Sequence, residues 1–204
     1  KESGVDIEAG YKVIDFLKKA AKPSKHVLSN FGGLGGLFSL DLKGYKDPVL
    51  VSCADGVGTK LKIAFMMGKH HTVGIDLVAM SVDDLVRSGA RPLYFVDYIA
   101  CQKNSPKLMR ELLNGVLRGC ERAGCDLVGG ETAELPDLYR QDEYDLAGFA
   151  VGIVERSKII DGKKIKPGHV IIGLASSGLH SNGYTLARKV LLDAAKLKLT
   201  DQLQ

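Results

Sequence analysis

The chain has 204 residues, of which 45% are hydrophobic and 25% are charged, and its formal net charge is +4. These values are typical of a soluble globular protein and exclude an intrinsically disordered chain. The basic residues form no stripe with interleaved aromatics, and no apolar run approaches the roughly 18 residues of a membrane span. We therefore expect neither nucleic-acid binding nor membrane binding.

The four cysteines lie in apolar segments and form no C-x-x-C pair. They are Cys53, Cys101, Cys120 and Cys125. We expect buried free thiols, which indicate a reducing compartment, and we predict a cytosolic location.

The first predicted elements surround a glycine-rich segment. Residues 5–21 carry apolar residues at helical spacing and predict a helix that Pro23 ends. Four glycines within residues 32–36 predict a mobile loop or a close backbone approach. Residues 49–53 are apolar and partly β-branched, and they predict a short buried strand.

The middle of the chain predicts two helices and a strand. Residues 74–88 predict a helix that ends at Gly89. We expect its apolar face to contain Val78, Val82, Leu85 and Val86, and its polar face to contain Asp76, Asp83 and Asp84. Residues 92–100 predict a strand, and Pro106 begins a second helix that Gly124 ends. The apolar stripe of this second helix contains Met109, Leu112, Leu113, Val116, Cys120 and Ala123.

Three further strands follow in the sequence. Residues 126–130 predict a short strand that the segment "GGETAELP" breaks, and residues 144–154 predict a longer one. Residues 170–175 predict another buried strand, and a helix is expected over about 184–192. The mixture predicts an α+β fold with α/β-type layers.

The domain organisation follows from the charged, turn-like residues 163–167, which indicate a boundary between residues 155 and 167. We predict an N-terminal domain over residues 1–155 and the incomplete beginning of a second domain over 168–204. Because the chain starts without methionine and stops just after a helical pattern, we expect a fragment of a longer polypeptide.

Three segments share one layout, in which a buried strand runs into a Gly-rich polar loop: 49–60, 126–136 and 170–183. Backbone amides in such loops can bind an anion. The stretch "ADGVGTKLK" at residues 54–62 is similar to a phosphate loop but lacks the Walker A order, because Thr59 precedes Lys60. It is either a nucleotide loop of another kind or an ordinary turn after a strand.

Acidic residues follow several of the apolar segments: Asp55, Asp83, Asp84 and Glu131. Carboxylates of this kind suit Mg²⁺, which binds through a few carboxylates together with nucleotide phosphates. The alternative is that each acid caps a helix or is a solvated surface charge. Asp97 lies inside an apolar strand, where a buried carboxylate needs a partner, and its role stays unassigned.

Two further side chains have a functional and a structural interpretation. Lys60 could bind a phosphate as a point charge, or it could be a solvated lysine at the start of the next helix. His180 lies among Ser177, Ser181 and Asn182, where it could contact substrate or satisfy a backbone carbonyl. The sequence has neither a G-x-S-x-G elbow nor a convincing cysteine nucleophile, so phosphoryl chemistry by positioning and electrostatics fits better.

Seven segments, in this order along nearly the whole chain, closely resemble the aminoimidazole ribonucleotide synthetase family. They are "SGVDIEAG" (3–10), "GGLGGLFSL" (32–40), "DGVGTKLKIA" (55–64), "GIDLVAMSVDDLV" (74–86), "GCDLVGGETAELP" (124–136), "DLAGFAVGIVE" (145–155) and "SSGLHSNGY" (176–184). The resemblance implies ATP-dependent ring closure of formylglycinamidine ribonucleotide to aminoimidazole ribonucleotide. ATP would activate the formyl oxygen before the amidine nitrogen attacks.

The resemblance also implies roles for individual residues. The ATP-binding residues would be Asp55, Gly56, Val57, Gly58, Thr59, Lys60 and Asp76. Mg²⁺ would be held by Asp55, Asp84 and Glu131. The substrate would be contacted by Thr132, Ser177, Gly178, His180, Ser181 and Asn182, with His180 as the catalytic candidate. Asp83 stands where many family members have Asn, so it receives no role.

Family members are dimers whose N-terminal sheets pair into a shared barrel, with active sites near that interface, so we expect a homodimer. In animals this activity is the middle part of a trifunctional purine enzyme, and the ends of the chain fit such a fusion. Two alternative functions stay open. One is an ATP-dependent kinase or amidating synthetase of the same superfamily, and the other is a non-catalytic nucleotide-binding or dimerisation module.

Overall fold

The computed structural model describes residues 6–29, 31–33 and 35–202. In chain order, the helices and strands are α1 (Ile7–Ala20), β1 (Pro48–Gly56), α2 (Leu61–Met67), α3 (Val73–Arg87), β2 (Arg91–Cys101), α4 (Pro106–Ala123), β3 (Asp126–Glu134), β4 (Tyr144–Glu155) and α5 (Tyr184–Arg188). Short 3₁₀ turns lie at Gly58–Lys60 and Arg156–Lys158, and a π-helical turn at Lys189–Ala194 follows α5. Within the described residues, no helix is long and apolar enough to cross a membrane.

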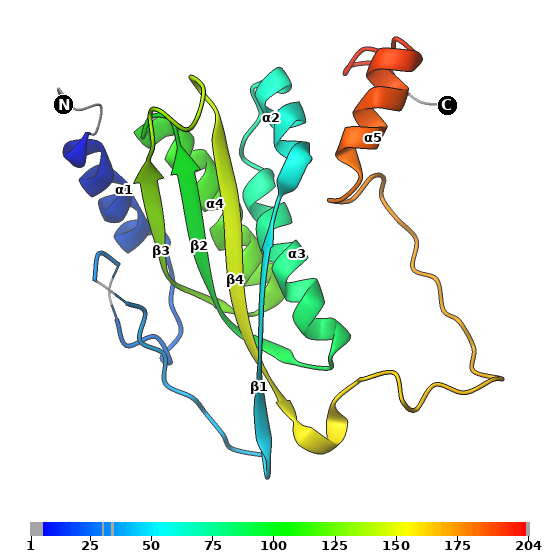
Figure 1. Ribbon diagram of the computed structural model, residues 1–204. Helices are drawn as coiled ribbons and strands as arrows, with labels where there is room; N and C mark the ends of the chain where they lie inside the picture. Colours follow the sequence, from blue (N-terminus) through cyan, green and yellow to red (C-terminus); the bar gives the residue numbers. More distant parts are fainter. Residues whose placement is uncertain (1–5, 30, 34, 203–204) are drawn as a thin grey trace.

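The four strands form one mixed sheet in the order β1-β4-β2-β3. Strand β4 is antiparallel to both β1 and β2, whereas β2 and β3 are parallel and joined by the crossover helix α4. Helices α3 and α4 pack together and cover one face of the sheet (Figure 1). The mixed α and β architecture confirms the predicted fold class.

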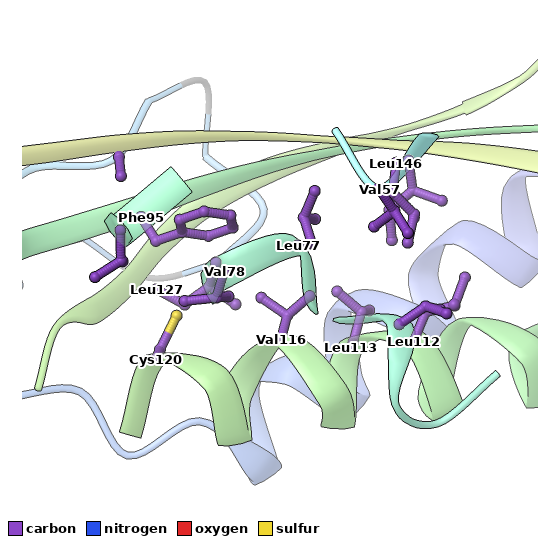
Figure 2. Packing of buried hydrophobic residues seen from close by; sticks show 14 of the residues in the cluster. Val57, Leu77, Val78, Phe95, Leu112, Leu113, Val116, Cys120, Leu127 and Leu146 are labelled. Atoms are coloured by element: carbon purple, nitrogen blue, oxygen red, sulfur yellow. The ribbon is translucent and has the colours of Figure 1, made fainter. Parts of the chain in front are cut away.

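The core lies between this sheet and the two helices (Figure 2). Five of the six residues predicted for the stripe of the helix after Pro106 are buried, and the sixth, Ala123, is partly buried against the core. The five are Met109, Leu112, Leu113, Val116 and Cys120. They face the side chains of α3 and of the inner sheet surface, among them Leu77 and Phe95. Burial of such a stripe is the main source of stability for a helix of this kind.

The face predicted for the helix at residues 74–88 is correct for three of its four apolar residues. Val78, Val82 and Leu85 are buried, but Val86 is 54% exposed. Val86 follows Leu85 by one residue, and a 100° rotation takes its side chain to the edge of the packed stripe, where neither α4 nor the sheet covers it.

Two strand predictions need correction in extent or burial. Strand β1 forms but is not buried, because it is an edge strand that pairs only with β4, and Leu50 on its outer face is 53% exposed. Strand β3 does not end at Gly130 but continues through the glycines to Glu134, since its parallel ladder with β2 extends to the pair Cys101 and Glu134. The ladder outweighs the weak strand propensity of glycine there.

The predicted strand at residues 170–175 is wrong. No strand forms there, and its aliphatic side chains are nearly fully exposed, because no neighbouring strand provides hydrogen-bond partners. The helix expected over 184–192 contains α5 followed by the π-helical turn.

The glycine-rich segment near residue 32 does make a close backbone approach. A Cβ atom on Gly36 would lie 2.7 Å from the carbonyl oxygen of Val128 on β3, so only glycine fits against this strand. The segment therefore packs along the β3 edge of the sheet.

Candidate active site

The loop at residues 54–60 contains the last three residues of β1 and leads through a 3₁₀ turn into α2. Val57 is 1% exposed and anchors the loop in the core. Gly56 is required by packing, since a Cβ atom there would lie 2.9 Å from the carbonyl oxygen of Leu146. Gly58 adopts a φ of +68° in open space, so its backbone is accessible to a ligand.

Lys60 lies at the centre of a set of polar contacts. Its Nζ is 2.8 Å from Oδ2 of Asp76, and both side chains are about one-fifth exposed. The same Nζ donates a hydrogen bond of 3.1 Å to the carbonyl oxygen of His180. The ammonium group is therefore already paired with a carboxylate on α3, and a phosphate at this position would share or replace that pairing.

Two residues beside this loop were missed by the sequence analysis. The ring of Tyr184 has its centroid 5.4 Å from Nζ of Lys60, within cation–π range. The hydroxyl of Thr185 donates a 2.9 Å hydrogen bond to the hydroxyl of Thr59. Both residues begin α5 directly after the "HSNG" segment. This position next to a predicted substrate motif is the sequence feature that could have identified them.

The segment at residues 176–182 is organised by its own hydrogen bonds. The Ser176 hydroxyl donates to the carbonyl oxygen of Gly178, so its oxygen accepts the 2.8 Å hydrogen bond from Nε2–H of His180. This contact favours the Nε2–H tautomer of His180. The predicted substrate residues Ser177 and Asn182 are exposed in the same segment.

Asp55 and Asp84 both lie near Cys53. Burial raises the pKa of the Cys53 thiol, and the negative charges of Asp84 and Asp55 raise it further. The thiol donates to the carbonyl oxygen of Ser81 at 2.9 Å, which fixes Cys53 against α3. Asp83 on the same helix is exposed.

Glu131 does not join these two acids. Asp55 pairs with Gly148, Gly148 with Asp97, and Asp97 with Gly130 in one row across the sheet. Glu131 follows Gly130 directly, so it lies about three strand spacings, roughly 14 Å, from Asp55. Accordingly, no group of three or more His, Cys, Asp or Glu side chains in the described part of the chain could hold one metal ion.

Glu131 and Thr132 instead line a separate cavity of about 590 Å³ at the β3 edge. Residues 31–33 and 35–36 of the glycine-rich segment and side chains of α1 form its other walls. The predicted substrate residues are therefore divided between this cavity and the segment beside Lys60.

The cavity also contains Asp97, which the sequence analysis left without a role. Burial raises the pKa of Asp97 to about 7, and the charge of Glu131 adds to the shift. Gly130 packs directly against its carboxyl group, which leaves no space for a side chain there. Asn104 lines the same cavity, and within the described residues its buried Oδ1 has no hydrogen-bond partner.

Comparisons with known proteins give consistent results. A family model described as AIR synthase related protein, N-terminal domain, matches residues 40–154. The chain is 58% identical over 206 aligned residues to phosphoribosylformylglycinamidine cyclo-ligase of Acetivibrio thermocellus, which covers 100% of this chain and 60% of that protein. It is 57% identical over 201 residues to the protein of the same name from Bacillus cereus, covering 98% of this chain and 58% of that protein.

A solved structure shows the same fold. The hydrogenase maturation protein HypE in complex with ATP is similar, with a TM-score of 0.55 and 19% sequence identity, over 78% of this chain and 44% of that chain. The chain spans about 60% of the length of the curated relatives that it matches.

Proposed function

Because the chain belongs to the AIR synthase related protein family, we propose that the protein containing it is a phosphoribosylformylglycinamidine cyclo-ligase of purine biosynthesis. Two relatives that match 98–100% of this chain at 57–58% identity carry that name. The observation in the structure that supports the proposal most is the contact between two predicted ligand segments. Lys60 of the proposed nucleotide loop contacts His180 of the proposed substrate segment, and Thr59 contacts Thr185 in α5, which follows that segment.

The proposed reaction needs positioning more than a side-chain nucleophile. The terminal phosphoryl group of ATP transfers to the formyl oxygen of formylglycinamidine ribonucleotide, and ADP leaves. The amidine nitrogen that carries the ribosyl group attacks the activated carbon, the ring closes and phosphate leaves. In this proposal, the open amides at Gly58 and Thr59 bind phosphate oxygens, and Lys60 neutralises their charge.

His180 has a proposed role at the substrate. Its carbonyl oxygen is engaged by Lys60 and its Nε2 by Ser176, so the ring is held beside the nucleotide loop. A ring in this position could orient the substrate or move a proton during ring closure. Ser177, Gly178, Ser181 and Asn182 are proposed to contact the same substrate.

Mg²⁺ is a proposed cofactor, and part of the predicted ligand set fits it. Asp55 and Asp84 both lie near Cys53 and supply the hard oxygen atoms that Mg²⁺ prefers, with phosphate oxygens and water completing the coordination. The ion would reduce the charge repulsion between ATP and the attacking groups. Glu131 lies too far away to join them within one chain.

The contribution of Asp84 can be separated from that of Asp83. We expect Asp84→Asn to weaken Mg-ADP binding, measured by calorimetry, by about tenfold or more, which corresponds to at least about 1.4 kcal/mol. Asp83→Asn is the matched control, because it makes the same change one residue away on an exposed position. Equal effects of the two substitutions would contradict the assignment of Asp84.

A homodimer is also part of the proposal. The sheet face opposite α3 and α4 carries exposed apolar side chains, including Leu50 and Phe149, which is 46% exposed. A second copy packed on this face would cover them, as the resemblance to dimeric family members implies. The Glu131 and Thr132 cavity could then contribute to an active site near the interface.

A cytosolic location and a fusion to other purine-pathway domains are further proposals. The reduced cysteines are compatible with the first. The two relatives named above are bacterial and give no support to an origin in the animal trifunctional enzyme. Mass spectrometry of the natural protein would test the fusion.

The central experiment uses the natural protein that contains this chain. We expect phosphate release only when ATP and formylglycinamidine ribonucleotide are both present. Release at the same rate without the ribonucleotide would contradict the proposal. Turnover of a different phosphate acceptor in a substrate panel would favour a kinase or amidating synthetase instead.

A further inference from the structure

Helix α4 ends in a backbone motif that brings two cysteines together. Gly124 adopts a left-handed conformation with a φ of +66°. Its N–H donates to the carbonyl oxygen of Glu121 at 3.3 Å, and the N–H of Cys125 donates to the carbonyl oxygen of Cys120 at 3.0 Å. This pair of hydrogen bonds is the Schellman motif. In this motif, the residue after the glycine commonly contacts a residue of the last helical turn, and these two positions are here Cys125 and Cys120.

The same motif ends two other helices, which gives an internal comparison. At the end of α3, the N–H of Ala90 donates to the carbonyl oxygen of Leu85 at 3.2 Å, and both side chains are buried. At the end of α2, Lys69 donates in the same way to Ala64 at 3.1 Å. Only α4, among these three helices, places two thiols at the paired positions.

The two thiols interact directly. A hydrogen bond with Cys125 raises the pKa of Cys120, and burial and the charges of Asp97 and Asp126 raise it further. The same hydrogen bond lowers the pKa of Cys125, although burial and Asp126 oppose the shift. Of the two thiols, Cys125 is therefore the one whose ionisation the contact favours.

The pair is accessible from one side. Both cysteines line a cavity of about 380 Å³ between α1, α4 and β3, together with Lys22 and Arg118. Cys120 is 3% exposed, whereas Cys125 is half-buried. Two acidic side chains, Glu121 and Asp126, line the same cavity. A small reagent would therefore reach Cys125 first, because Cys120 is almost fully buried.

The other two cysteines lack these features. The Cys53 and Cys101 thiols donate to backbone carbonyl oxygens, of Ser81 and Ala133 respectively. Burial raises the pKa of both, to about 11 for Cys101. They serve as internal references for thiol reactivity within the same chain.

We propose that Cys120 and Cys125 form a paired-thiol modification site, which a hydroperoxide closes into an intrachain disulfide. In the first step, the Cys125 thiolate attacks a peroxide oxygen; an S–O bond forms, the O–O bond breaks and the leaving oxygen takes a proton. In the second step, the Cys120 sulfur attacks the Cys125 sulfur; the S–S bond forms, the S–O bond breaks and water leaves with the Cys120 proton. Two thiols lose two electrons, and hydrogen peroxide is reduced to two molecules of water.

The sequence provides a direct assay, because Arg122 lies between the two cysteines. Trypsin separates the peptides 119–122 and 123–140, so only a disulfide keeps them linked. The folded 204-residue chain is treated with hydrogen peroxide, its free thiols are blocked by alkylation, and it is digested without reductant. We expect the linked pair as the main oxidised product, and we expect reductant to separate it.

Single substitutions test the order of the steps. In Cys120→Ser, we expect a sulfenic acid at Cys125 that a dimedone probe traps, and in Cys125→Ser we expect Cys120 to stay reduced. At neutral pH, iodoacetamide should modify Cys125 at least about tenfold faster than Cys101, whose pKa is about 11, since each unit of pKa changes the thiolate fraction about tenfold. It should also modify Cys125 faster than Cys53, whose pKa is raised. Cys53→Ser should leave disulfide formation unchanged.

Two results would overturn the proposal. In the first, Cys53 or Cys101 is oxidised before Cys120 and Cys125. In the second, the peptides 119–122 and 123–140 of the peroxide-treated wild-type chain are recovered separately, with no disulfide between them. The peptide map of the wild-type chain tests the disulfide even if a serine variant does not fold. None of these outcomes depends on the cyclo-ligase function.

Discussion

The helix-backed sheet and the segment that follows it both contain runs of apolar residues, many of them β-branched, yet the two runs have opposite environments. In the sheet, residues such as Phe95 and Ile99 are fully buried between β2 and the helices. In the later segment, Val170, Ile171, Ile172 and Leu174 are 82–96% exposed along an extended path (Figure 1). The difference shows that strand formation depends on a partner strand and a covering layer as much as on local sequence.

The largest expected difference between the two regions is in stability. We expect Phe95→Ala to lower the free energy of unfolding by about 3–5 kcal/mol, because it leaves a cavity in a fully buried site. Ile171→Ala should change it by less than about 0.5 kcal/mol, because Ile171 is 96% exposed. Urea denaturation of both variants checks this contrast, and a similar loss in both would show that residues 170–175 are packed in solution.

The second prediction concerns charges in the two regions. Asp97 has a pKa of about 7 in the folded chain and about 3.9 when unfolded, so between these values the folded state binds more protons. The free energy of unfolding should therefore fall as pH rises from about 5 to 7, by about 2 kcal/mol, and this decrease should level off above about pH 8, where Asp97 is deprotonated in both states. Asp97→Asn should remove this dependence.

Asp161 provides the matched control for Asp97, because it is an exposed carboxylate in the later part of the chain. Lys163 lowers the pKa of Asp161 through a hydrogen bond, so this group does not titrate between pH 5 and 8. Asp161→Asn should leave the pH profile unchanged over that range. A wild-type stability that is flat between pH 5 and 7 would contradict the assignment for Asp97.

A third prediction tests the uncovered face of the sheet. If a second copy covers Phe149, then Phe149→Asp should raise the dissociation constant of the dimer by about tenfold or more, since a desolvated carboxylate costs at least about 1.4 kcal/mol. Val86→Asp is the control, because Val86 is similarly exposed but lies on α3, which covers the other face. Light scattering over a concentration series measures the dissociation constants of both variants. A wild-type chain that is monomeric over this series would contradict the proposed interface.

The smallest expected effect is at the connection between the two regions. Lys60→Gln removes the ion pair with Asp76 and weakens the contacts with His180 and Tyr184. We expect faster hydrogen exchange across α5, with a loss of global stability below about 1 kcal/mol. Lys62→Gln removes a comparable ion pair, to Glu143, without touching the later segment, and should leave this exchange unchanged. Equal exchange in both variants would show that Lys60 does not hold α5.

The elements that could be predicted from sequence are those governed by local rules. The stripe and the Gly124 end of α4 follow from helical periodicity and from the glycine at its C-terminus. The close approach of the glycine-rich segment near residue 32 was one of the two alternatives predicted, although its partner, Val128, was not.

The missed features depend on contacts between distant parts of the chain. Strand β3 continues past its glycines because β2 supplies a ladder, and residues 170–175 form no strand because nothing supplies one. The separation of Glu131 from Asp55 follows from the strand order, which no local pattern encodes. Tyr184 meets Lys60 only through folding, so its position beside the proposed nucleotide loop could not be predicted from spacing.

The most direct test of the account follows the formyl oxygen. The natural protein that contains this chain is given ATP and formylglycinamidine ribonucleotide labelled with ¹⁸O at the formyl group, and the released phosphate is analysed by mass spectrometry. Phosphoryl activation of the formyl oxygen predicts that each inorganic phosphate formed carries one ¹⁸O atom from the substrate. The proposed mechanism would be contradicted if the ring closes but the released phosphate is unlabelled and the ¹⁸O is found in water.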